Sequence, residues 1–218
     1  MPILLMSGRN WPACVRLLSG ALVSICLLAT SGCGGFAPPS VDPALAANTA
    51  MSQYDKNGDG ELDREELAAC PALIDALVEY DLNGDKQISH EKLTVIQKKM
   101  YNSEISLTAT YCRVTLNGKP LQGAKVLFIP EGFLGENTTL PAEGVTDGSG
   151  MTDMSVPVEE LPEELKRYRK LHAGVYRVEI THPEVELPAR YNTESELGYE
   201  VHPDAHGGSH AVFDLKSK

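Results

Sequence analysis

The sequence at residues 55–66 is Asp55-Lys56-Asn57-Gly58-Asp59-Gly60-Glu61-Leu62-Asp63-Arg64-Glu65-Glu66. Its oxygen-bearing side chains fall at alternate positions, and a glycine stands at the middle of the stretch. At such a sharp bend, a residue with a Cβ atom costs roughly 1 kcal/mol or more, which explains the glycine. The residues at positions 1, 3, 5, 7, 9 and 12 are Asp55, Asn57, Asp59, Glu61, Asp63 and Glu66.

This spacing predicts a calcium site. Calcium takes six to eight oxygen ligands at loose geometry, and an EF-hand loop supplies them from these six positions. Glu61 would contribute its backbone carbonyl, and Glu66 would close the shell with both carboxylate oxygens. The alternative is a polar turn between two helices, because Asp, Asn and Gly are common in turns that bind no metal. A chance match at six specified positions is the less favoured explanation.

A second stretch, residues 81–92, repeats the pattern with two changes. Lys86 replaces the glycine at position 6, and Lys92 puts an ammonium group where the bidentate glutamate is expected. Both changes weaken calcium binding, because affinity depends on the charge and number of ligands. Glu91 could replace the missing glutamate, but it stands one position early and would have to reach around to the ion. The alternative is a partner hand that only packs against the first. The ligands of a second, weaker metal site would be Asp81, Asn83, Asp85 and Gln87.

The two stretches together resemble an EF-hand pair. Leu62 and Ile88 both stand at position 8, and the resemblance implies that they form a short β bridge between the hands and that residues 55–92 fold as one unit. Asp42-Pro43 is a helix start, so residues 43–54 are expected to form the entering helix. An exit helix from about Asp63 to Ala69 would stop at Pro71 and restart beyond it.

The first 33 of the 218 residues are predicted to be an export signal. Arg9 and Arg16 give a basic start, and the apolar run from Leu17 to Ala29 is too short to span a bilayer comfortably. Residues 28–33 resemble the lipobox of bacterial lipoproteins, although Thr30 stands where leucine is usual. The resemblance implies that Cys33 carries lipid and anchors the chain to a membrane. Simple cleavage and secretion remains an alternative, and an uncleaved anchor is disfavoured.

Charge and cysteine content narrow the function classes. The chain has 30 acidic and 19 basic residues, a net charge of −11, which argues against a nucleic-acid partner. Outside the signal and Cys33, only Cys70 and Cys112 remain. They are expected either to form a disulfide in an oxidising compartment or to be two buried thiols.

From residue 104 the pattern changes to the alternation typical of strands. Asn117-Gly118 predicts a tight hairpin turn, and Asp147-Gly148-Ser149-Gly150 predicts another. The short apolar runs between turns indicate a β-sandwich of about 110 residues. Four segments then resemble the carboxypeptidase regulatory-like, transthyretin-like domains of bacterial envelope lipoproteins. They are residues 116–126, 145–150, 173–178 and 187–192.

That resemblance covers about 104–216 and implies a seven-stranded sandwich with a structural or binding role. Its motifs are turn and core signatures, so they indicate a fold and no reaction. The expected organisation is α+β and multidomain. It comprises a lipoprotein signal peptide (1–33), a tether (34–41), a small all-α EF-hand pair (42–102) and a transthyretin-like β-sandwich (104–216).

We find no pattern that favours an enzyme. His202, His206 and His210 recur at helical spacing, but Pro203 and Gly207 argue against a helix there, so transition-metal binding is disfavoured. The sequence also lacks a nucleophile elbow. We therefore expect a calcium-binding, lipid-anchored envelope protein with a structural or interaction role. The alternative is a dockerin-like module that binds a protein partner in the presence of calcium.

Overall fold

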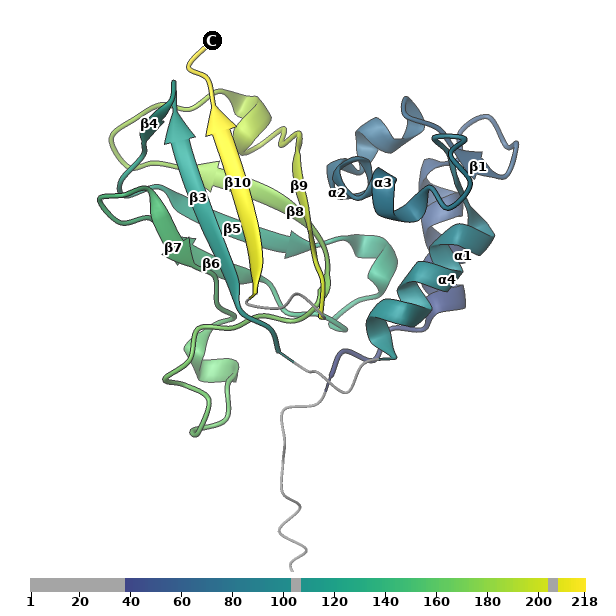
Figure 1. The fold of residues 1–218 in the computed structure, drawn as a ribbon, viewed down its shortest axis with the longest axis horizontal. Helices are drawn as coiled ribbons and strands as arrows, with labels where there is room; N and C mark the ends of the chain where they lie inside the picture. The colour runs from purple at the N-terminus through teal and green to yellow at the C-terminus, as the bar shows by residue number, and fades with distance from the viewer. Residues whose placement is uncertain (1–37, 103–106, 204–207) are drawn as a thin grey trace, which may run out of the picture. The chain divides into compact units, whose positions relative to one another are not determined.

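The computed structural model describes residues 38–102, 107–203 and 208–218, all within one compact unit, Gly34–Lys218 (Figure 1). The predicted signal peptide, the lipidation site Cys33 and most of the tether lie outside these residues. Along the chain, helices joined by one short two-stranded pair come first, and two larger sheets follow. None of the helices in the described ranges is long and apolar enough to cross a membrane.

The helix that precedes the first loop begins and ends as predicted. Helix α1 (Pro43–Tyr54) has Asp42 as its N-cap, and the Asp42 carboxylate accepts hydrogen bonds from the backbone N–H groups of Ala44 and Leu45 at 3.0 and 3.1 Å. Helix α4 (His90–Tyr101) follows the second loop and is capped by Ser89, whose hydroxyl accepts from the Lys92 N–H at 3.3 Å. A side-chain cap of this kind contributes about 1 kcal/mol.

The predicted exit helix is wrong in length and type. The segment after the first loop forms only a short 3-10 turn, η1 (Glu66–Ala69). Pro71 then begins helix α2 (Pro71–Asp75), and helix α3 (Leu77–Tyr80) follows after Ala76. Because proline has no N–H and its ring clashes with the preceding turn, one continuous helix cannot pass through residue 71.

The predicted bridge between the two hands is confirmed. Strands β1 (Glu61–Leu62) and β2 (Ile88–Ser89) pair antiparallel, with Leu62 opposite Ile88. Both side chains are fully buried. The bridge therefore joins the centres of the two loops to each other and anchors both in the helical core.

The rest of the chain forms two four-stranded sheets (Figure 1). In one sheet β3 lies between β10 and β4 and also pairs with β7; in the other the order is β6-β5-β8-β9. The β10–β3 pair is parallel, and the other pairs are antiparallel. The strands are β3 (Thr110–Leu116), β4 (Lys119–Pro120), β5 (Lys125–Pro130), β6 (Ala142–Val145), β7 (Met151–Asp153), β8 (Gly174–Thr181), β9 (Leu197–Val201) and β10 (Ser209–Leu215).

The two sheets share one hydrophobic core. Phe128 of β5 contacts Phe213 of β10 edge-on, with ring centroids 6.5 Å apart. The described part of the chain thus has eight strands in these sheets, where the sequence resemblance implied seven. The short 3-10 turns between them are η2 (Gly132–Leu134), η3 (Val158–Glu160) and η4 (Ala189–Tyr191).

Both predicted turns are present. Asn117 and Gly118 have φ angles of 52° and 79° between β3 and β4, as a two-residue hairpin turn requires. In the second turn the Gly150 N–H donates to the Asp147 carbonyl at 2.9 Å. These turns were predictable because they depend on local dihedral preferences.

The helical core extends onto the second sheet. Phe133, Leu134, Ala173 and Val175 pack with the buried side chains of the helices. The division of the chain into separate domains at 42–102 and 104–216 stays a prediction. Cys70 and Cys112 are both buried and free, so the disulfide alternative does not hold in this structure.

Candidate calcium site

The first loop runs from the end of α1 to the start of η1. Asp55, at position 1, is the C-terminal cap of α1. Its two carboxylate oxygens accept hydrogen bonds from the backbone N–H groups of Gly58 at 2.7 Å and Gly60 at 3.0 Å. Both glycines have positive φ, 75° and 87°, although a Cβ atom at either would meet nothing within 4 Å. Glycine is therefore required at these positions by the backbone conformation and not by a lack of space.

Positions 3 and 5 continue the same pattern. The Asn57 side-chain oxygen accepts from the Asp59 N–H at 2.8 Å, and Asp59 accepts from the Glu61 N–H at 2.9 Å. The Asn57 amide also donates to the second Asp59 oxygen at 3.0 Å. A carboxylate has about four lone-pair sites, so these bonds leave oxygen lone pairs free for a cation.

Glu66, at position 12, closes the loop. One of its oxygens accepts from the N–H groups of Lys56 at 2.7 Å and Asn57 at 3.1 Å, and the other accepts from the Asp63 N–H at 3.2 Å. Asp63 in turn accepts from the N–H groups of Glu65 and Glu66 at 2.8 and 3.0 Å. These hydrogen bonds hold the Glu66 carboxylate, at the last ligand position, against the first residues of the loop.

The donor set fits calcium by its chemistry, because every predicted ligand is a carboxylate, amide or carbonyl oxygen. The loop is not gathered into a finished metal shell, however. In the described ranges, no group of three or more His, Cys, Asp or Glu side chains is close enough together to hold a metal. Calcium would need Glu66 to exchange its backbone N–H partners for the ion.

The second loop repeats these hydrogen bonds. Asp81 accepts from the N–H groups of Gly84 at 2.8 Å and Lys86 at 3.0 Å, as Asp55 does from Gly58 and Gly60. Asp85 accepts from the Gln87 N–H at 2.9 Å and from the Asn83 amide at 2.6 Å. The two loops therefore share one internal conformation, even though their sequences differ at positions 6 and 12.

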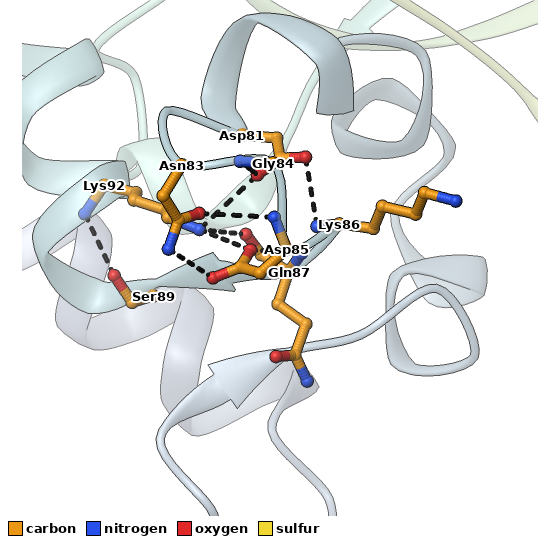
Figure 2. A network of polar contacts seen from close by, with 8 residues as sticks. All are labelled: Asp81, Asn83, Gly84, Asp85, Lys86, Gln87, Ser89 and Lys92. Atoms are coloured by element: carbon orange, nitrogen blue, oxygen red, sulfur yellow. Dashed lines mark hydrogen bonds and ion pairs between the residues drawn. The ribbon is translucent and has the colours of Figure 1, made fainter.

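Lys92 is the feature that distinguishes the second loop (Figure 2). Its ammonium group donates to Asp85 Oδ1 at 2.6 Å and to the Gln87 carbonyl at 2.8 Å, and it lies 3.7 Å from Asp81 Oδ1. Together with backbone and Asn83 hydrogen bonds, the bond from Lys92 lowers the pKa of the Asp85 carboxyl to about 2. Glu91, the alternative ligand, is exposed.

Sequence reasoning recognised that Lys92 disfavours calcium, but it missed where the ammonium goes. The signal was present in the sequence, since a lysine at position 12 follows carboxylates at positions 1 and 5. Only the fold shows that the lysine turns back into the loop. The structure thus brings three of the four predicted second-site residues, Asp81, Asp85 and Gln87, around an ammonium group, and the fourth, Asn83, donates to Asp85.

The histidines do not form a metal site among the described residues. His210 lies on β10 and stacks on Tyr111, with ring centroids 5.2 Å apart. His206 lies outside the described residues. The prediction that these histidines bind no transition metal therefore stays a prediction.

A buried polar network on α3, α4 and β9 was not predicted. The Tyr80 hydroxyl donates to Glu200 at 3.0 Å and accepts from the Gln97 amide at 3.0 Å. Burial raises the pKa of the Glu200 carboxyl to about 7, and Glu79 and Asp75 nearby add to this shift. No periodicity in the sequence links these residues.

Comparison with known proteins supports the assignment of the first loop as an EF-hand. Residues 48–71 match the EF hand family, and this range contains the whole first loop. No curated protein matches the chain in sequence. The crystal structure of a DUF3823 family protein from Parabacteroides merdae is similar over 50% of this chain and 45% of that chain, at 13% identity and a TM-score of 0.30. This chain therefore spans less than half of that protein's length, and so weak a similarity carries no inference about function.

Proposed function

We propose that this chain is a calcium-binding protein of the bacterial cell envelope, with one calcium ion in the loop at residues 55–66. The observation that carries the proposal is the ordered set of oxygen ligands in that loop. The EF-hand match at residues 48–71 supports it. Calcium would supply a fixed positive charge that holds the ends of the loop together.

The second loop indicates which atoms would face the ion. There the Lys92 ammonium lies beside Asp81 Oδ1, Asp85 Oδ1 and the Gln87 carbonyl. Because the two loops share their internal hydrogen bonds, the corresponding atoms of the first loop are the facing oxygens at its positions 1, 5 and 7. These belong to Asp55, Asp59 and Glu61.

The ion would have a structural role. Extracellular calcium modules bind in the range of about 10⁻⁴ to 10⁻³ M, a level that calcium outside cells often exceeds. At ten times the dissociation constant, bound calcium adds about 1.4 kcal/mol to the free energy of unfolding. A site that stays filled suits a rigid spacer better than a sensor.

Titration calorimetry on the full-length protein in detergent tests the proposal. We expect one calcium site in the wild type, lost or strongly weakened in Glu66→Gln, because the amide cannot replace a bidentate carboxylate. Glu65→Gln is the matched control, since Glu65 is exposed and only its backbone N–H bonds within the loop. Absence of binding to the wild type at millimolar calcium would refute the proposal.

Lipid on Cys33 would attach the protein to the envelope membrane, and the transthyretin-like sandwich would be presented there as an accessory. The support is the lipobox-like residues 28–33 and the two sheets around one core. Cys33→Ser is expected to move the protein from the membrane fraction to the soluble fraction, with Cys26→Ser as control. Equal membrane retention of both variants would contradict lipid anchoring through Cys33.

A dockerin-like interaction module is the second candidate. It is favoured by large apolar side chains that the helical region leaves exposed: Leu45, Val78, Leu82 and Val95. If the hand pair binds an envelope protein, capture of that protein should need calcium and be lost in both Glu66→Gln and Val78→Ser. Capture that persists with a chelator would exclude this mode.

A further inference from the structure

The ammonium group of Lys92 has the contacts expected of a bound cation. In an EF-hand, a calcium ion takes oxygens from positions 1, 5 and 7 of the loop, among others. Lys92 contacts the atoms of the second loop at these same positions, in Asp81, Asp85 and Gln87. Two of the three are hydrogen bonds at 2.6 and 2.8 Å, and the third is an ion pair at 3.7 Å.

The charge is well enclosed. Lys92 is only 8% exposed, which is unusual for a lysine, and such a charge needs a partner of opposite sign. Figure 2 shows its side chain directed into the loop, whereas the side chain of Lys86 points away. Lys86 therefore contributes its backbone N–H to the loop, and Lys92 contributes the positive charge.

The position of Lys92 on the fold fixes this arrangement. Ser89 caps α4 by accepting from the Lys92 N–H at 3.3 Å, so the backbone of residue 92 is held in the first turn of the helix. Position 12 of an EF-hand loop lies at the same place, and from there a side chain reaches back to the ion. A lysine there is long enough to put its ammonium at the ion's position.

We infer that Lys92 is the built-in cation of the second loop, so that this loop is closed without metal and excludes calcium. The second hand would then be folded before calcium arrives. Through the β1–β2 pair it holds Leu62 and the centre of the first loop in place. Calcium would then bind to the first loop alone, with a Hill coefficient of 1. That last consequence rests on the proposed calcium function of the first loop, whereas the role of Lys92 does not.

The first test removes the ammonium and keeps the length of the side chain. Lys92→Met is expected to lower the urea midpoint of unfolding in the presence of a chelator, because Asp81 and Asp85 then face each other without a cation. Lys98→Met is the matched control, since Lys98 is an exposed residue of the same helix. An equal midpoint for the two variants would overturn the inference.

The second test restores the glutamate that an EF-hand has at position 12. By calorimetry at saturating calcium, Lys92→Glu is expected to bind one calcium ion more than the wild type, and Lys98→Glu none more. A wild type that binds two calcium ions would overturn the inference, as would a Lys92→Glu variant with no added site. If the wild type binds none and Lys92→Glu binds one, the role of Lys92 stands and the proposed function fails.

Discussion

Lys86 adopts a backbone conformation that suits glycine. Its φ angle is 64°, and the only other non-glycine residues with positive φ in the described ranges are Asn117 and Asn137. Asparagine tolerates this region because its short side chain bonds locally, whereas lysine does so at a cost of about 1 kcal/mol. Gly60, at the same position of the first loop, has a φ of 87° and no such cost. The second loop therefore keeps the EF-hand bend under strain.

We predict that Lys86→Gly stabilises the protein. The free energy of unfolding should rise by about 0.5–1 kcal/mol, because the strain is relieved while the N–H bond to Asp81 is kept. Urea denaturation measures the change. Lys86→Ala is the control, since it removes the same charge but retains the Cβ atom. If alanine stabilises as much as glycine, the gain comes from charge and the strain argument is wrong.

Strand β9 and helix α2 approach each other at a glycine. A Cβ atom on Gly198 would lie 2.0 Å from the backbone nitrogen of Ala72, which is far inside contact distance. Because the obstacle is backbone, no rotation of a side chain can relieve the clash. The contact between this strand and this helix thus depends on one residue without a side chain.

Gly198→Ala is expected to lower the free energy of unfolding by about 2 kcal/mol or more, through forced separation of β9 and α2. Gly132→Ala is the control, because a Cβ atom there meets nothing within 4 Å and its φ is not positive. Chemical denaturation of both variants gives the comparison. Equal stability of the two would mean that the two elements are not packed as described.

The Tyr80–Glu200 contact between α3 and β9 introduces a pH dependence. The folded pKa of Glu200 is about 7, against an ordinary value of 4.5, mainly because of burial. The folded state therefore holds the proton more tightly than the unfolded state. This stabilisation is complete below about pH 4.5 and is lost as the pH rises to about 7.

Glu200→Gln should remove this dependence and keep an acceptor for the Tyr80 hydroxyl. We expect the variant to be more stable than the wild type at pH 8, by on the order of 2 kcal/mol, and nearly equal to it at pH 4.5. Unfolding measured across that range, with the exposed Glu196→Gln as control, tests the prediction. Parallel pH profiles for all three proteins would contradict it.

At the scale of elements, the sequence predicted what depends on neighbouring residues. The start of α1 at Asp42-Pro43 and the Asn117-Gly118 turn follow from local signals, and the Leu62–Ile88 bridge follows from the resemblance of the two loops to paired EF-hands. The exit helix was wrong in its bounds and type, since only the 3-10 turn at Glu66–Ala69 forms there, whereas the stop and restart at Pro71 follow from the proline itself. The Tyr80–Glu200 contact has no sequence pattern behind it, and the course of the Lys92 side chain, although its charge and position could be read, is decided only by the folded chain.

For the molecule as a whole, the two hands differ in whether a lysine ammonium lies within the loop. The second hand carries its own ammonium, and the first presents a similar loop without one. The core beneath both hands continues onto the second sheet through Phe133 and Val175. A calcium ion in the first loop would therefore bind to a part of the molecule whose core is already packed.

The most direct measurement is a calcium titration followed by amide NMR. The Gly60 and Lys86 N–H groups make the same bond in the two loops, to Asp55 and Asp81 respectively, each at 3.0 Å. We predict that the Gly60 resonance moves and saturates with one calcium ion, while that of Lys86 stays nearly fixed. A Gly60 resonance that does not move at millimolar calcium, or equal movement of both, would contradict the account.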